Sequence, residues 1–265
     1  MLSIQLQKHE NSEMDYSKKQ NIYFLKLMKT IKQFTFYILL LFAATSCIED
    51  FTIRGNGIAV TQVRQVPSFD KVISSGSFDV HITKGDELEV VLNAEENILP
   101  YIETSVSNNT LLIDIRGMHN VKNRLPMNMY ITIPELLSVK QSESDNITTD
   151  YFTADRMEFF ISGSGSISTT VDANVLDASI SGSGWMIIDG DANQSNLAIS
   201  GSGNIDCSNL TVNNCNANIS GSGNMQVKAV KTIYAKISGS GNIYYTGNPG
   251  LELNISGSGK VIPVN

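Results

Sequence analysis

A five-residue sequence, Ile-Ser-Gly-Ser-Gly, occurs six times in the second half of this chain and constrains its fold more than any other feature. The copies begin 18–20 residues apart, at Ile161, Ile180, Ile199, Ile219, Ile237 and Ile255. We expect a degenerate copy at residues 142–147, where Glu143 and Asp145 stand in place of glycine, and a more distant echo from Ser75. A fixed period of this length is typical of repeat architectures, in which each unit packs against its neighbours.

The residues around the pentad alternate between apolar and polar. The positions two and four before each pentad isoleucine, and six and eight after it, are mostly apolar. Alternation with period 2 is typical of a strand with one buried face, and glycine permits a sharp corner between two such strands. A flexible Gly/Ser linker would not keep these positions in phase. The sequence therefore predicts an all-β chain folded as a β-solenoid, similar to a parallel β-helix, with coils of about 18–20 residues.

This register makes predictions about single residues. The pentad isoleucines should form one continuous buried column, in which Ile219 has no solvent contact, whereas Ser222 in the same corner should point outward. Cys207 and Cys215 fall on inward positions. We therefore favour two buried thiols there, and the alternative is a disulfide across the core.

The residues that follow the pentads form a further column: Ser166, Trp185, Asn204, Asn224, Asn242 and Lys260. Three stacked asparagines at a corner indicate a ladder of side-chain amides, because asparagine tolerates the left-handed backbone conformation. The alternative is a surface-binding strip formed by Trp185, Asn204, Asn224 and Asn242. The structural interpretation is favoured, because an internal ladder explains the spacing without a ligand.

The N-terminal half is also strand-like, but it is less regular. Strands are predicted at residues 58–66, 78–83, 88–92, 111–115 and 129–133. Lys84-Gly85-Asp86 and Asn108-Asn109 resemble hairpin turns, and residues 94–101 resemble a short helical turn. We divide the chain into a leader at 1–47, a tether with the first strand at 48–68, and one solenoid at 69–265 with halves 69–140 and 141–265.

The leader has the pattern of an export signal. Residues 34–46 are apolar, but thirteen residues are fewer than the roughly 20 that a membrane-spanning helix needs. They fit a signal peptide that begins at Met28, which makes residues 1–27 an over-long start. Ala44-Thr45-Ser46-Cys47 resembles the lipobox of bacterial lipoproteins, so we expect a lipid on Cys47 to attach the protein to the outer membrane of the cell envelope. The acids Glu49 and Asp50 resemble a signal for export to the cell surface.

Composition excludes several classes of function. The net charge is −7, and an acidic chain argues against a nucleic-acid partner. Three histidines and three cysteines are too few for a zinc ribbon or a disulfide scaffold. The stretch Gly-Ser-Gly-Asn-Ile-Asp that ends at Asp206 resembles a calcium-binding repeat, but the equivalent positions in the other coils are not acidic. We therefore expect no metal and no cofactor.

An enzyme that cleaves polysaccharides is the natural rival, because parallel β-helices include such enzymes. Their sites need several acidic and basic side chains that converge on one groove. Residues 161–265 contain no arginine, four lysines and six acids, spread around the coil. We therefore predict no catalytic residues, and a purely structural envelope protein is the third possibility.

The chain resembles the auto-transporter adhesin head GIN domain family, which is common in Bacteroidota lipoproteins. The resemblance covers about Phe69 to Val264, and the matching stretches are Phe69-Asp70-Lys71-Val72, Phe78-Asp79-Val80-His81-Ile82, Lys84-Gly85-Asp86, Asn109-Thr110-Leu111-Leu112-Ile113, the repeated Ser-Gly-Ser-Gly-Asn-Ile, and Ile243-Tyr244-Tyr245-Thr246-Gly247-Asn248-Pro249. The resemblance implies an all-β solenoid-like fold, an envelope location and adhesion, and it supplies no catalytic residues. Together with the leader, it predicts a non-enzymatic envelope lipoprotein that presents a solenoid face to an extracellular glycan or protein.

Overall fold

The computed structural model describes residues 52–117 and 120–264. The predicted leader, with Met28 and Cys47, lies outside the described residues. Among the described residues, no helix is long and apolar enough to cross a membrane. Within residues 52–117 and 120–264, the one helical element is the 3₁₀ turn η1 (Leu99–Tyr101), which falls inside the helical turn predicted at residues 94–101.

The rest of the fold is built from strands. In chain order they are β1 (Thr52–Arg54), β2 (Ala59–Val63), β3 (Lys71–Gly76), β4 (Asp79–Lys84), β5 (Glu89–Glu95), β6 (Ile102–Ser107), β7 (Thr110–Ile115), β8 (Asn120–Lys122), β9 (Asn128–Ile133), β10 (Ser138–Glu143), β11 (Asn146–Gly163), β12 (Ser166–Gly182), β13 (Trp185–Gly201), β14 (Asn204–Gly221), β15 (Asn224–Gly239), β16 (Asn242–Thr246), β17 (Gly250–Gly257) and β18 (Lys260–Pro263).

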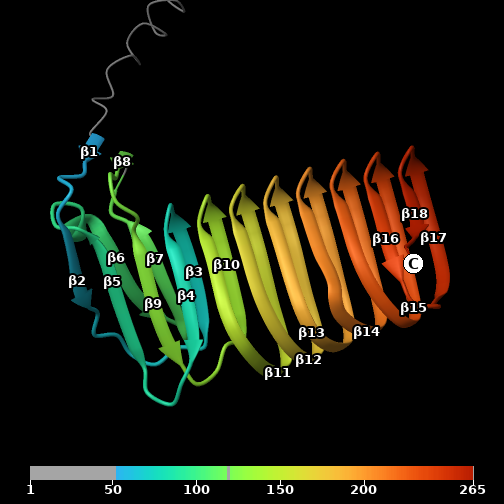
Figure 1. Cartoon of the computed structure of the whole chain (residues 1–265), viewed down its shortest axis with the longest axis horizontal. Coiled ribbons are helices and arrows are strands. Elements are labelled where there is room, and N and C mark those ends of the chain that lie inside the picture. The colour runs from blue at the N-terminus through green and yellow to red at the C-terminus, as the bar shows by residue number, and fades with distance from the viewer. Residues whose placement is uncertain (1–51, 118–119, 265) are drawn as a thin grey trace, which may run out of the picture. The chain divides into compact units, whose positions relative to one another are not determined.

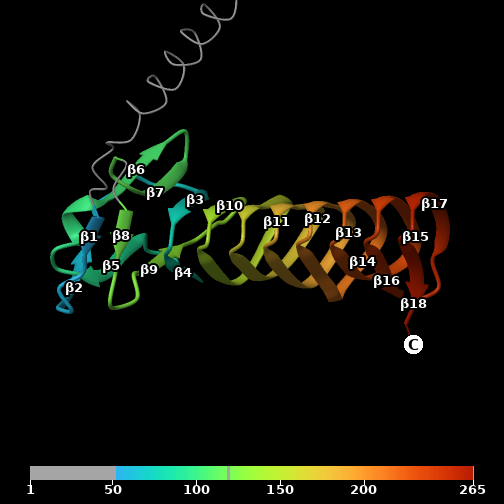
Figure 2. The same cartoon turned by 90° about the horizontal axis from the view of Figure 1, so that it is seen from above.

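The predicted β-solenoid is confirmed. Strands β11–β15 each wind once around the core and pair in parallel with the next coil, so that like residues stack on like (Figure 1). The pentad isoleucines are in register, from Ile161 opposite Ile180 to Ile237 opposite Ile255. The solenoid has two long faces (Figure 2). One face, here called the β4 face, contains the whole strands β2, β5, β9, β4, β16 and β18 and the first halves of β11–β15. The other, the β3 face, contains the whole strands β6, β7, β3, β10 and β17 and the second halves of β11–β15.

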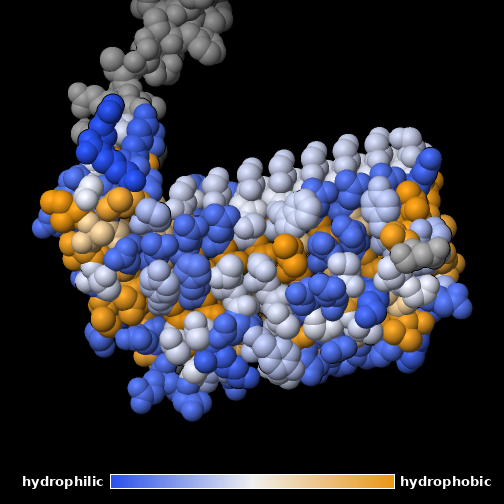
Figure 3. Space-filling view, viewed as in Figure 1, coloured by the Kyte–Doolittle hydropathy of each residue, from blue (hydrophilic) through white to orange (hydrophobic). Residues whose placement is uncertain are grey.

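The buried column is present, with one correction. Ile219 is 2% exposed between Ile199 and Ile237, and Ser222 is exposed, as predicted. Ile255, however, is 41% exposed, because its strand β17 pairs only with β15 and no other described strand covers it. The prediction of a fully buried column is therefore wrong at the last coil. Figure 3 shows apolar residues at this end of the solenoid.

The two glycines of each pentad have different roles. The first glycine has a positive φ, for example +134° at Gly221, which side-chain-bearing residues rarely adopt. The second glycine leaves no room for a side chain, since a Cβ on Gly223 would lie 2.1 Å from the carbonyl oxygen of Gly203 in the preceding coil. The corners form the row of knobs along the upper edge in Figure 3.

The degenerate copy at residues 142–147 keeps the register of the corner. Ser142 pairs with Ser162 and Glu143 pairs with Gly163, while on the other side Gly76 pairs with Glu143. Glu143 has a φ of +69°, so a glutamate occupies the left-handed position that glycine takes elsewhere. The corner is therefore distorted but closed.

The N-terminal half differs from the prediction in two ways: β3, β6 and β10 are absent from the predicted strands, and one predicted turn is wrong. The Asn108-Asn109 turn is a hairpin between β6 and β7, and its φ angles of 50° and 57° suit the type I′ turn. Lys84-Gly85-Asp86 is not a hairpin turn, because β9 lies between β4 and β5, parallel to β4 and antiparallel to β5. Parallel pairing needs a long crossover, which residues between β4 and β9 supply.

Candidate functional site

The column that follows the pentads lies on the β4 face, and its asparagines form the predicted ladder. Asn224 Nδ2 donates a hydrogen bond to Asn204 Oδ1 at 3.2 Å, and Asn242 Nδ2 donates to Asn224 Oδ1 at 3.3 Å. The same two oxygens accept the backbone N–H groups of Asn224 and Asn242. Because their side chains are half-buried and hydrogen-bonded between coils, these asparagines support the coils.

Trp185 interrupts this ladder. It stands in register between Ser166 and Asn204, and its side chain is 45% exposed. Ile187, two residues further along the same face, is 37% exposed. Trp185 therefore differs from the three asparagines of the predicted strip: the half-buried asparagines bond to one another between coils, whereas Trp185 presents an apolar surface.

A second aromatic surface lies on the same row as Ile187. This row runs in register from Ile187 through Ser168 and Thr148 to His81 and Tyr130. The rings of His81 and Tyr130 stack with centroids 5.2 Å apart, His81 Nδ1 lies 2.8 Å from Thr148 Oγ1, and Tyr130 is 48% exposed. Three strand spacings, about 14 Å, separate Ile187 from His81.

We call this row, together with Trp185, the aromatic strip. It therefore comprises Trp185, Ile187, Ser168, Thr148, His81 and Tyr130. Sequence reasoning missed its N-terminal end, because His81 and Tyr130 meet only through the pairing of β4 with β9. Strands were predicted at residues 78–83 and 129–133, but these patterns carry no signal of which strands become neighbours.

The strip presents rings and hydroxyls on a sheet rather than a concave reaction site. Among the residues that the structure describes, no group of three or more His, Cys, Asp or Glu side chains could hold a metal ion. Such a surface can bind a partner by stacking and hydrogen bonding.

Several ionisable groups that do not belong to the strip are buried. Cys207 and Cys215 are free, buried thiols, as predicted. Burial raises the pKa of Cys215 to about 11, and it raises the pKa of Cys207 well above its ordinary value, so both stay protonated and unreactive. Burial also raises the pKa of Asp145 to about 6, at the distorted corner.

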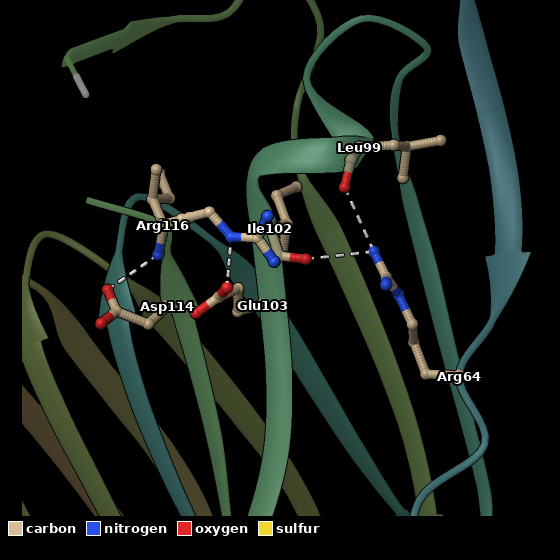
Figure 4. Close-up of polar contacts among 7 residues, drawn as sticks. Arg64, Leu99, Ile102, Glu103, Asp114 and Arg116 are labelled. Carbon is tan, nitrogen blue, oxygen red and sulfur yellow. Dashed lines mark hydrogen bonds and ion pairs between the residues drawn. The ribbon is translucent and has the colours of Figure 1, made fainter. Parts of the chain in front are cut away.

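Two arginines fix the base of the β6–β7 hairpin (Figure 4). Arg64 Nη2 donates to the carbonyl oxygens of Leu99 at 3.3 Å and Ile102 at 3.2 Å, and burial lowers the pKa of its guanidinium. Arg116 forms an ion pair with Glu103 across the hairpin. These contacts hold the start and the end of the hairpin, which projects from the β3 face.

Comparison with known proteins supports this fold. A crystal structure of a putative adhesin from Bacteroides fragilis matches with a TM-score of 0.76 at 24% identity, over 80% of this chain and 100% of that one. A putative lipid binding protein from Parabacteroides distasonis matches with a TM-score of 0.71 at 23% identity, over 81% of this chain and 100% of that one. A putative adhesin from Parabacteroides merdae matches with a TM-score of 0.65 at 22% identity, over 81% of this chain and 99% of that one.

These likenesses, all below 25% identity, establish the solenoid fold. The search of curated proteins finds no match. A family model matches residues 68–249, which is more than half of the chain and agrees with the resemblance seen in its motifs. The chain therefore belongs to the family described as "Putative auto-transporter adhesin, head GIN domain".

Proposed function

We propose that this protein is a non-enzymatic lipoprotein of the cell envelope, attached to the outer membrane by a lipid on Cys47. In this proposal the aromatic strip binds an extracellular glycan or protein and so mediates adhesion. The observation that carries the proposal is the exposure of Trp185 at 45% and Ile187 at 37%, two residues apart on the β4 face and beside the hydrogen-bonded ladders of the regular coils.

The rigidity of this face supports binding. Hydrogen-bonded ladders flank Trp185, through Ser166 and Asn146 on one side and Asn204 and Asn224 on the other. These ladders hold the coils on either side of Trp185, so less backbone freedom is lost on association. Tryptophan buries a large apolar area and is enriched among the residues that dominate binding energies.

The chemistry of the strip favours binding over catalysis. His81 is the one imidazole in the strip, and its Nδ1 lies at 2.8 Å from Thr148 Oγ1. Hydrolysis of glycosidic bonds commonly uses two carboxyl groups on either side of the bond. The six residues of the strip include no carboxylate.

Binding of the purified protein to glycan and extracellular-matrix arrays tests the proposal. Trp185→Ala should weaken binding to the ligands found by at least about tenfold, as for a central aromatic contact. The matched control is Tyr234→Ala, which removes a ring that is 41% exposed on the β3 face. Equal loss in both variants, or no loss in Trp185→Ala, contradicts the proposal, as does release of products from a polysaccharide.

Attachment to the membrane has a separate test. Metabolic labelling with palmitate should mark the wild type but not Cys47→Ser. Equal labelling of the two would show that the lipid is not on Cys47 and would remove the lipoprotein part of the proposal.

A further inference from the structure

The β3 face contains a groove beside the β6–β7 hairpin, which stands out from this side of the solenoid in Figure 2. The groove has a volume of about 460 Å³ and is lined by Asn108 and Thr110 of the hairpin and by residues of β3, β10 and β11. We call it the hairpin groove. The tip of the hairpin is held beside β3, because the backbone N–H groups of Asp70 and Lys71 donate to the carbonyl oxygen of Asn109 at 3.1 and 3.2 Å.

The hairpin groove gathers positive charge on an acidic protein. Lys71, Lys140 and Arg156 line it together with one carboxylate, Glu158, whereas the whole chain has a net charge of −7. Arg156 is paired with Asp177 at 2.6 Å. Neither Lys71 nor Lys140 forms an ion pair with another described residue, so two cations on neighbouring strands are free to bind an anion.

A second groove continues the first along the solenoid axis. It has a volume of about 530 Å³ and begins at Phe160, the residue that pairs with Lys140. Small residues such as Ser179 and Ala198 line it, together with the serine hydroxyls of the pentads. The two grooves therefore form one track that has Lys71 and Lys140 at one end, a phenyl ring next to them, hydroxyl groups beyond, and Lys236 at the far end.

This track favours a sugar chain over a peptide. Strands β7, β3, β10 and β11 each have a hydrogen-bonded strand on both sides, so no free sheet edge is available for a peptide to extend. A sugar chain instead presents hydroxyl groups to serine side chains and apolar ring faces to Phe160. Carboxylate or sulfate groups on the chain would pair with the lysines.

We propose that this track binds an extended acidic glycan, with its carboxylate or sulfate groups held by Lys71 and Lys140 in the hairpin groove. This site lies on the β3 face, whereas the aromatic strip lies on the β4 face. The two sites are therefore independent of each other.

Titration of the purified protein with oligogalacturonate, a sulfated oligosaccharide and a neutral malto-oligosaccharide tests the proposal. The wild type should bind one or both acidic probes, and added salt should weaken the binding. Lys71→Gln/Lys140→Gln should weaken it by at least about tenfold, since charge-assisted hydrogen bonds are lost. The matched control, Lys228→Gln/Lys231→Gln, removes the same charge at exposed positions outside the groove and should bind as the wild type does.

Several outcomes would overturn the proposal. These are failure of both acidic probes to bind, equal loss in the two double variants, and equal binding of the neutral probe. Polyglutamate binding as tightly as the acidic glycans would assign the groove to an acidic peptide instead. Trp185→Ala should leave acidic-glycan binding unchanged, so failure of this site and failure of the aromatic strip can be told apart.

Discussion

Replacing Asp145 with asparagine should stabilise the protein, although it removes a native buried residue. Asp145 is fully buried at the distorted corner, and its Oδ1 accepts the backbone N–H of Phe78 at 2.9 Å. Its carboxylate lies near the Ser74 hydroxyl, and Gln141 Oε1 is buried without a hydrogen-bond partner among the described residues. An asparagine can keep the bond from Phe78 and use its amide N–H groups to donate to one of these acceptors.

The magnitude follows from the pKa of the carboxyl group. Burial is the largest cause of the rise of this pKa from 3.8 to about 6, and the negative charges of Glu143 and Asp79 raise it further. Hydrogen bonding by the Phe78 N–H and the Ser74 hydroxyl acts to lower the pKa. Between these two pH values the folded state binds more protons than the unfolded state, so stability falls as pH rises through the window. A shift of about 2 units corresponds to about 3 kcal/mol above pH 6.

Urea unfolding followed by circular dichroism, from pH 4 to pH 7.5, measures this effect. Asp145→Asn should match the wild type near pH 4 and exceed its free energy of unfolding by about 2–3 kcal/mol at pH 7.5. The control, Asp86→Asn, alters an exposed residue and should leave the difference near zero at every pH. A difference that does not change with pH, or a variant that is less stable at pH 7.5, would refute the assignment of the charge penalty to Asp145.

Three further predictions concern stability. Ile219→Ala should lower the free energy of unfolding in urea by about 2–5 kcal/mol, because it leaves a cavity in the buried column. Ser222→Ala should change the free energy of unfolding by less than about 0.5 kcal/mol. Similar losses in the two variants would argue against the buried register. Gly223→Ala should cost at least about 2 kcal/mol, since its Cβ would meet the Gly203 carbonyl oxygen at 2.1 Å, and a neutral result would mean that the corner yields easily. Glu95 is buried, and desolvation acts to raise the pKa of its carboxyl group. Hydrogen bonds from the backbone N–H groups of Arg124, Gly57 and Leu125, together with the charge of Arg124, outweigh desolvation and lower the pKa. The stability that Glu95 contributes is therefore present above pH 4.5 and is lost as pH falls through the lowered pKa. Glu95→Gln should therefore speed hydrogen exchange of these three amides at pH 7, and unchanged exchange would show that the carboxylate does not hold them.

The regular coils could be predicted in detail because the sequence pattern that specifies them is local and is repeated in every coil. The alternation around each pentad fixes which side chains point inward, and the glycines fix the corners, so each coil specifies its register on the next. The burial of Ile219, the free thiols of Cys207 and Cys215, and the amide ladder of Asn204, Asn224 and Asn242 all followed from this phase. Only the last coil departed, because it has a neighbour on one side alone.

The candidate sites depended on pairings that no local pattern specifies. Trp185 was identified from its column, but the stack of His81 on Tyr130 requires β9 to insert between β4 and β5. In the hairpin groove, the pairing of β3 with β10 likewise brings Lys71 close to Lys140, although the two residues are distant in sequence.

The sequence alone therefore determined the fold class, the coil length and the direction of most side chains in the repeat. The tertiary structure alone decided how the irregular N-terminal strands close the solenoid and which outward side chains become neighbours. The physical reason is that a repeated coil has equivalent partners above and below it, so its own pattern selects its register. A non-repeated strand has several possible partners, and the choice among them depends on loop closure and on the packing of the whole assembly.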